Sequence, residues 1–169
     1  TIEANPLPYY LSALEALDSE MGRLINSLSD EEKANTIIIF IGDNGTPGQV
    51  AQAPYGRRTV KGSLYQGGIN VPMVVSGNGV NRMGVRESAL INSTDLYATI
   101  GNLAGVSATE IHNSQSFFDV LTDENGAKRD IVYSEKEDAY TIRNASYKYI
   151  KYVTGAEEFY NLSTDAYEN

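Results

Sequence analysis

The chain has 169 residues, which is enough for one ordinary domain or for one domain with a small appendage. Hydrophobic residues make up 41% of it, so a packed core is feasible, while a formal net charge of -9 argues against a nucleic-acid-binding protein, which needs a cationic face. The chain has no Cys, which excludes disulfides, thiolate metal sites and Cys nucleophiles, and it has no apolar run long enough to span a membrane.

The first half of the chain has the alternation of helix and strand that is typical of α/β proteins. Apolar residues recur every three or four positions from Leu11 to Leu28, which predicts a helix with one face buried on another element. Residues 36–41 are uniformly apolar after Thr36 and rich in β-branched side chains, which predicts a strand buried on both faces. A second buried strand is expected at residues 71–75. The long loop between the two strands, rich in Gly and polar residues, is typical of a functional loop or of disorder.

The second half begins with a predicted helix at residues 95–104, with Ser93 or Thr94 as its cap and Gly105 in the left-handed position that ends it. A shorter helical segment is expected at residues 115–121. Three short antiparallel strands then follow, at residues 131–134, 140–143 and 148–153. These patterns predict two parts, an α/β part at residues 1–127 and a small antiparallel β subdomain at residues 128–169.

The first candidate site is Gly42-Asp43-Asn44-Gly45, directly after the first predicted strand. Ligands of open α/β sheets bind beyond the carboxyl ends of strands, and the oxygens of Asp43 and Asn44 suit Ca²⁺ or Mg²⁺. Asn-Gly also forms tight hairpin turns, so a simple turn remains the alternative.

The second candidate site is Lys61, which precedes a glycine-rich segment and could reach an anion, although most lysines are solvated at the surface. The same two interpretations apply to Arg57 and Arg58. The single His, His112, lies in a polar stretch without a Gly-x-Ser-x-Gly motif, which favours a surface position over a catalytic triad. Asp95 could be a ligand, but an acid in the first turn of a helix is also explained by the helix macrodipole.

Five segments, in this order, resemble the C-terminal part of a sulfatase of the alkaline phosphatase superfamily. They are residues 10–28, 35–45, 61–72, 94–106 and 158–169. The most distinctive is Lys61-Gly62-Ser63-Leu64-Tyr65-Gln66-Gly67-Gly68-Ile69-Asn70-Val71-Pro72. The resemblance implies that residues 1–127 are the C-terminal half of the catalytic α/β domain, a helix-covered sheet, and that residues 128–169 are its small β subdomain.

The resemblance also implies roles for three residues in the hydrolysis of sulfuric esters. Asp43 and Asn44 match ligands of the family's divalent cation, usually Ca²⁺ (or Mg²⁺), and Lys61 matches the catalytic Lys that binds the sulfate group. The nucleophile of the family is a formylglycine made from Cys or Ser in Cys/Ser-x-Pro-x-Arg. This chain departs from the family at Gln66 and Asn70, where Glu and Arg are common, so the substrate class stays open.

The nucleophile motif is missing from this chain. Its Pro residues are preceded two positions earlier by Ala4, Pro6, Gly45, Gln52 and Asn70, and none of these is a Cys or a Ser. We therefore expect a sulfatase fragment that does not turn over alone, with a sulfated small molecule or glycan as the substrate of the complete enzyme. A phosphate or phosphonate ester hydrolase and a non-catalytic binding or structural module are the alternatives. The fragment is expected to expose apolar surface and to self-associate through it, and its relatives suggest a periplasmic, secreted or lysosomal location.

Overall fold

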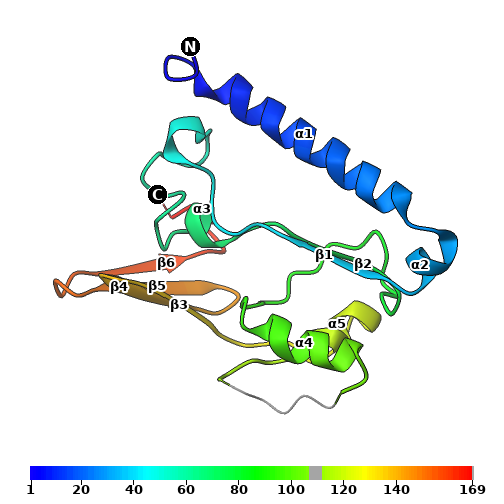
Figure 1. The fold of residues 1–169 in the computed structure, drawn as a ribbon. Coiled ribbons are helices and arrows are strands. Elements are labelled where there is room, and N and C mark those ends of the chain that lie inside the picture. Colours follow the sequence, from blue (N-terminus) through cyan, green and yellow to red (C-terminus); the bar gives the residue numbers. More distant parts are fainter. Residues whose placement is uncertain (107–111, 169) are drawn as a thin grey trace. The chain divides into compact units, whose positions relative to one another are not determined.

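The computed structural model describes residues 1–106 and 112–168. Its contacts divide the chain into two compact units, Thr1–Asn78 and Gly79–Asn169. The first unit contains α1 (Pro6–Ser27), α2 (Asp30–Ala34), β1 (Ile37–Ile41), the 3₁₀ helix η1 (Gly48–Val50), α3 (Gln66–Ile69) and β2 (Met73–Gly77), all labelled in Figure 1 except η1. The second contains α4 (Asp95–Leu103), α5 (Phe118–Thr122), β3 (Val132–Lys136), β4 (Ala139–Arg143), β5 (Tyr147–Tyr152) and β6 (Glu157–Asn161).

The long helix α1 confirms the predicted periodic segment but not its burial. Pro6 occupies the first turn, where its missing N–H costs no hydrogen bond. No α1 residue is buried within the described chain, and Leu24 is 62% exposed. The expectation that this stripe is buried on another element is wrong for these residues, because the short helix η1 contacts α1 without burying any of its side chains. The apolar surface expected on a fragment is therefore present, while self-association through it stays a prediction.

The polar segment Ser29–Glu32, which follows α1, opens the short helix α2. The Ser29 side chain accepts a hydrogen bond from the Glu32 backbone N–H, and the Glu32 carboxylate accepts one from the Ser29 backbone N–H. This reciprocal pair is a capping box. The backbone and hydroxyl hydrogen bonds from Ser29 lower the pKa of Glu32.

Strands β1 and β2 form a two-stranded antiparallel ribbon, in which Ile39 lies opposite Val75. The strand predicted to be buried on both faces is only half-buried along Ile37–Phe40, and Ile41 is exposed. That expectation is wrong here because an uninterrupted apolar run needs cover on both faces, which the described residues do not supply. Gly77 ends the ribbon at φ 109°, where a Cβ would lie 2.2 Å from the Thr36 carbonyl oxygen.

The second unit confirms the predicted helix at residue 95, which ends at Leu103, one residue before the expected end. Gly105 has φ 74°, as a left-handed helix end requires. The expected cap is not formed, since Thr94 occupies the capping position without a side-chain hydrogen bond. The Asp95 carboxylate instead accepts a hydrogen bond from the Asn92 backbone N–H, 2.8 Å away. The next helical segment, α5, begins three residues later than expected.

Strands β3 to β6 form one antiparallel sheet in chain order. The three strands expected after residue 127 are present within a few residues, and β6 is a fourth strand that was not predicted. On one face, Thr141, Lys148 and Ile150 are fully buried, as strand alternation requires. The other face carries aromatic rings stacked in pairs across neighbouring strands, namely Tyr133 with Tyr140 and Tyr147 with Phe159. The predicted domain boundary at residue 127 stays a prediction.

Candidate functional site

The predicted metal loop, Gly42–Gly45, leaves the end of β1 and is held by backbone hydrogen bonds. Gly42 N–H donates to the Pro72 carbonyl oxygen at 2.9 Å, and Gly45 N–H donates to the Gly68 carbonyl oxygen at 3.0 Å. A Cβ on Gly45 would lie only 2.0 Å from the Gly67 carbonyl oxygen, so only glycine permits this approach. The alternative of a tight hairpin turn is wrong, because the strand that pairs with β1 begins only at Met73.

Asp43 is exposed in this loop and Asn44 is half-buried. Both offer oxygen donors of the kind that a hard divalent cation binds, and each comes from a loop whose backbone is fixed at both ends. Within the described residues, no group of three or more His, Asp or Glu side chains could hold a metal. Ca²⁺ takes six to eight oxygens. The two residues therefore fit part of a cation site, and the rest must come from elsewhere.

The second predicted site residue, Lys61, lies on a segment joined to the metal loop. Its backbone N–H donates to the Thr46 carbonyl oxygen at 3.0 Å, three residues after Asp43. Lys61 is exposed and lines an open hollow of ≈ 430 Å³. Asp43 and Asn44 are not among the residues that line this hollow. The backbone thus connects the two segments, while the convergence of the three side chains on one ligand stays a prediction.

The glycine-rich segment after Lys61 is a compact turn that ends in α3. Ser63 N–H donates to the Val60 carbonyl oxygen at 3.0 Å, and the Ser63 hydroxyl is buried with no hydrogen-bond partner among residues 1–106 and 112–168. A Cβ on Gly68 would lie 2.3 Å from the Ser63 carbonyl oxygen. Gln66, which stands where the family commonly has Glu, is buried in this turn. Its neighbour Gly67 is equally constrained, because a Cβ there would lie 2.5 Å from the Thr59 carbonyl oxygen.

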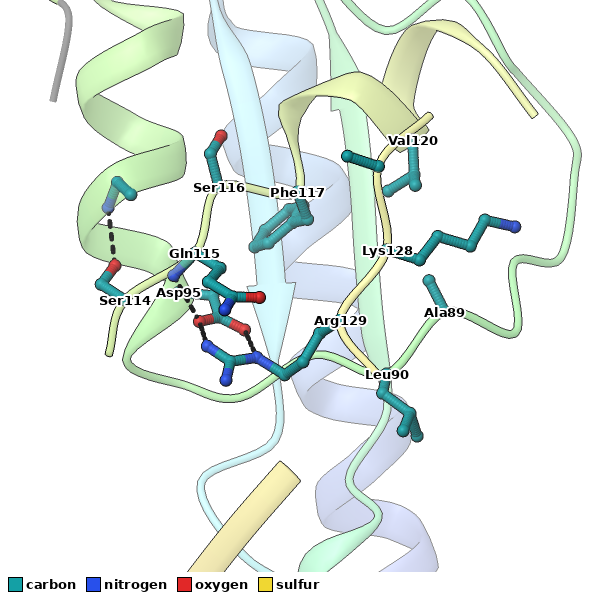
Figure 2. A pocket seen from close by; sticks show the side chains of 12 residues that line it. Ala89, Leu90, Asp95, Ser114, Gln115, Ser116, Phe117, Val120, Lys128 and Arg129 are labelled. Atoms are coloured by element: carbon teal, nitrogen blue, oxygen red, sulfur yellow. Dashed lines mark hydrogen bonds and ion pairs between the residues drawn. The ribbon is translucent and has the colours of Figure 1, made fainter. Parts of the chain in front are cut away.

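A separate polar centre lies in the second unit, where Asp95 and Arg129 form a bidentate ion pair (Figure 2). Asp95 is 1% exposed, and its carboxylate also accepts hydrogen bonds from the Asn92 and Gln115 backbone N–H groups. Two donors therefore reach each carboxylate oxygen. The helix macrodipole alone is thus the wrong explanation for this Asp, because its main partner is an Arg 34 positions further along the chain.

A cavity of ≈ 320 Å³ adjoins this pair, and its lining residues are drawn in Figure 2. Residues 114–117 are attached to α4 by two more hydrogen bonds. Ala98 N–H donates to the Ser114 hydroxyl at 3.1 Å, and Phe117 N–H donates to the Thr99 hydroxyl at 3.0 Å. Since the charges of Asp95 and Arg129 already satisfy one another, this centre is structural. His112 is exposed in a turn, as expected from its polar surroundings.

The predicted closing segment is attached to the sheet by a buried ion pair that the sequence did not reveal. Lys148 Nζ on β5 lies 2.5 Å from Glu168 Oε1, and neither side chain is exposed. Burial lowers the pKa of the Lys148 ammonium, and the hydrogen bond that it donates to the Glu168 carboxylate opposes that shift. The last residue of the expected motif, Asn169, lies outside the described residues. The motif therefore fixes the end of the chain on the buried face of the sheet.

Comparison with known proteins identifies the class to which this loop and its glycine-rich partner belong. The Sulfatase family model matches residues 1–106, well over half of the chain. The chain therefore belongs to the Sulfatase family, whose members hydrolyse sulfuric esters and generally use a metal ion and a formylglycine. No helix in the described part of the chain is both long and apolar enough to cross a membrane.

Individual relatives agree with this assignment. Arylsulfatase K of Gallus gallus is 27% identical over 174 residues, which cover 93% of this chain and 31% of that protein. A 2-O GAG sulfatase of known structure is 25% identical with a TM-score of 0.67, covering 79% of this chain and 30% of that one. BT4656, solved with its substrate D-glucosamine-2-N,6-O-disulfate, is 24% identical with a TM-score of 0.78 over 93% of this chain and 34% of that one, which shows the fold. The chain spans about a third of the length of the curated relatives that it matches.

Proposed function

We propose that this chain supplies part of the cation and sulfate site of a sulfuric ester hydrolase. In this proposal Asp43 and Asn44 are two of the oxygen ligands of a divalent cation, Ca²⁺ or Mg²⁺, and Lys61 binds the sulfate group. The observation that carries the proposal is a pair of hydrogen bonds with the predicted sulfate-binding segment, one from Gly45 in the predicted metal loop to Gly68 and one from Lys61 to Thr46, the residue directly after that loop. Membership of the family supports the same chemistry.

Each of the three side chains has a separate task in this reaction. A bound divalent cation supplies Lewis-acid polarisation of the sulfate oxygens. Asp43 brings the negative charge that retains a cation, and Asn44 adds a neutral oxygen from the same loop. The Lys61 ammonium neutralises negative charge that develops on the sulfuryl oxygens as the ester bond breaks. The Lys61 backbone is hydrogen-bonded to Thr46, directly after the metal loop, which fixes the point from which this flexible side chain extends.

The 169 residues contain no Cys, and none of the residues two positions before a Pro is a Ser, so they lack the nucleophile of the family. We therefore propose that the chain does not hydrolyse esters alone and that turnover requires the remaining sulfatase segments. The relatives named as an arylsulfatase and a GAG sulfatase support a sulfated glycan or small molecule as the substrate class. A periplasmic, secreted or lysosomal location is part of the same proposal.

The test uses the full-length protein that carries this chain, with an aryl sulfate and the matching aryl phosphate as substrates. Lys61→Ala should lower kcat on the sulfate by about 10²–10³, the usual effect of removing one group that stabilises transition-state charge. Lys33→Ala, an exposed residue of α2, is the matched control and should have no effect. Asp43→Ala should lower the amount of tightly bound Ca²⁺ or Mg²⁺ measured by elemental analysis.

Each outcome bears on a different part of the proposal. Unchanged kcat in Lys61→Ala would show that Lys61 is not part of the site. Unchanged metal content in Asp43→Ala would show that the loop Gly42–Gly45 does not bind the metal. Faster hydrolysis of the phosphate than of the sulfate would indicate that the protein is a phosphate ester hydrolase of the same superfamily and not a sulfatase. Hydrolysis of the aryl sulfate by the 169-residue chain alone, above a Lys61→Ala background, would refute its dependence on the missing segments.

A further inference from the structure

The charges of the first unit are distributed unevenly along the chain. The protein is acidic overall, with a net charge of -9, yet no Asp or Glu occurs from Asn44 to Asn78. The same stretch contains three cationic residues, Arg57, Arg58 and Lys61. The part of the unit that follows the metal loop is therefore purely cationic, which is the charge that complements a polyanion.

Two of these cations line the same hollow. It has a volume of ≈ 430 Å³ and is lined by Pro47, Gly48, Gln49, Arg57 and Lys61. Arg57 and Lys61 are the charged residues of that lining, and neither side chain forms an ion pair within the described residues. Arg58, the next residue after Arg57, is also exposed but does not line the hollow.

The backbone holds both cations beside the predicted sulfate site. The chain at Arg57 approaches Gly48 so closely that a Cβ on Gly48 would lie 2.8 Å from the Arg57 carbonyl oxygen. Lys61 is held to Thr46 by its backbone hydrogen bond of 3.0 Å. Both walls of the hollow are thus fixed to the short segment that directly follows the metal loop.

We infer that Arg57 binds a second anionic group of the substrate, a sulfate or a carboxylate, while Lys61 binds the sulfate that is cleaved. This inference rests on the proposed function, because it takes Lys61 as the sulfate-binding residue. A planar guanidinium binds either anion through two parallel hydrogen bonds, which an ammonium does not. The volume of the hollow is at the lower end of the range of small-molecule pockets, which suits one sugar ring rather than a long segment of a glycan.

The inference makes Arg57 a specificity-determining residue that distinguishes doubly charged sugars from singly charged ones. Its exposure limits the strength of the contact, since water and salt screen a solvated charge. We therefore expect the loss of Arg57 to act mainly on KM and to spare kcat. Gln49, also on the rim of the hollow, offers an amide group but no charge.

The test compares Arg57→Ala with Arg58→Ala in the full-length protein, using three substrates. One is a sugar with a single sulfate, the second has an additional sulfate, and the third has a carboxylate in place of the additional sulfate. Arg57→Ala should raise KM about five- to tenfold for the second, the third or both, and leave the first unchanged. Arg58→Ala should leave all three unchanged. The substrate whose KM rises in Arg57→Ala identifies which second anion the hollow accepts.

The possible results separate this inference from the proposed function. An equal change in KM for all three substrates in Arg57→Ala, or no change in any, would overturn the inference while the sulfatase function stands. An equal response to Arg57→Ala and Arg58→Ala would reduce the effect to general surface charge and would also overturn it. Failure of the unaltered protein to hydrolyse any of the three would overturn the proposed function, and the inference with it.

Discussion

Replacing Arg129 by Ala should destabilise the second unit strongly, because it leaves a buried carboxylate without its counter-charge. Asp95 is 1% exposed and accepts four hydrogen bonds, two of them from the Arg129 guanidinium. The Asn92 and Gln115 backbone N–H groups would remain as donors. Removing one partner of a buried ion pair costs about 3–5 kcal/mol, a large share of the free energy of unfolding of an ordinary domain.

Lys128→Ala is the matched control for this variant, because Lys128 is the neighbouring cation and also forms an ion pair. Its ammonium lies 3.0 Å from the Glu87 carboxylate, but its side chain is 39% exposed. Partly solvated pairs of this kind contribute about 0–1 kcal/mol. The difference between the losses of unfolding free energy in the two variants therefore measures how much more a buried ion pair costs to break than a partly exposed one.

The assay is urea unfolding of the 169-residue chain, followed by circular dichroism, with amide hydrogen exchange to assign the change to the second unit. Protection of the Phe117 amide should fall in Arg129→Ala, since that amide donates to Thr99 in the same polar centre. Asp95→Ala combined with Arg129→Ala should cost less than the sum of the two single changes, because no uncompensated charge stays buried. Equal costs for Arg129→Ala and Lys128→Ala, or full additivity in the double variant, would refute the reasoning.

Two further predictions concern the metal loop and acid stability. Gly45→Ala should destabilise the first unit in urea unfolding, because the new Cβ would lie 2.0 Å from the Gly67 carbonyl oxygen, whereas Gly22→Ala in α1, with nothing within 4 Å, should be neutral or add about 0.5–1 kcal/mol of stability. Hydrogen bonds from Arg82 and, secondly, from Lys128 lower the pKa of Glu87 from 4.5 to about 2, so their stabilising effect is complete above pH 4.5 and is lost as the pH falls towards 2. Glu87→Gln should flatten the dependence of unfolding free energy on pH in that interval, and an unchanged slope would contradict this.

Elements whose signals are local could be predicted from the sequence. The end of α4 could be predicted because a glycine after an amphipathic segment is typical of a helix end, and Gly105 indeed follows α4 with φ 74°. The strands of the sheet followed from runs of Tyr, Ile and Val between turn residues. The strand β6 was missed because its residues, Glu157–Asn161, include no β-branched side chain and two acids.

The packing of these elements could not be predicted in the same way. The apolar periodicity of α1 and the apolar run of β1 indicate that these residues avoid water, but not which segment covers them. In this chain Leu24 remains 62% exposed and Ile41 is exposed as well. The ion pair between Asp95 and Arg129 was equally hidden, since two charges 34 positions apart give no local pattern.

The candidate site shows the same division between what local motifs specify and what folding adds. Asp43, Asn44 and Lys61 could each be selected from the sequence because each stands in a distinctive motif, whereas Arg57 looked like one of two solvated arginines. Folding separates that pair, since only Arg57 lines the hollow with Lys61. Arg57 and Arg58 are a useful comparison because their side chains are chemically identical and differ only in their surroundings. Any difference between Arg57→Ala and Arg58→Ala therefore reports on the hollow itself and not on the loss of a positive charge from the acid-free stretch.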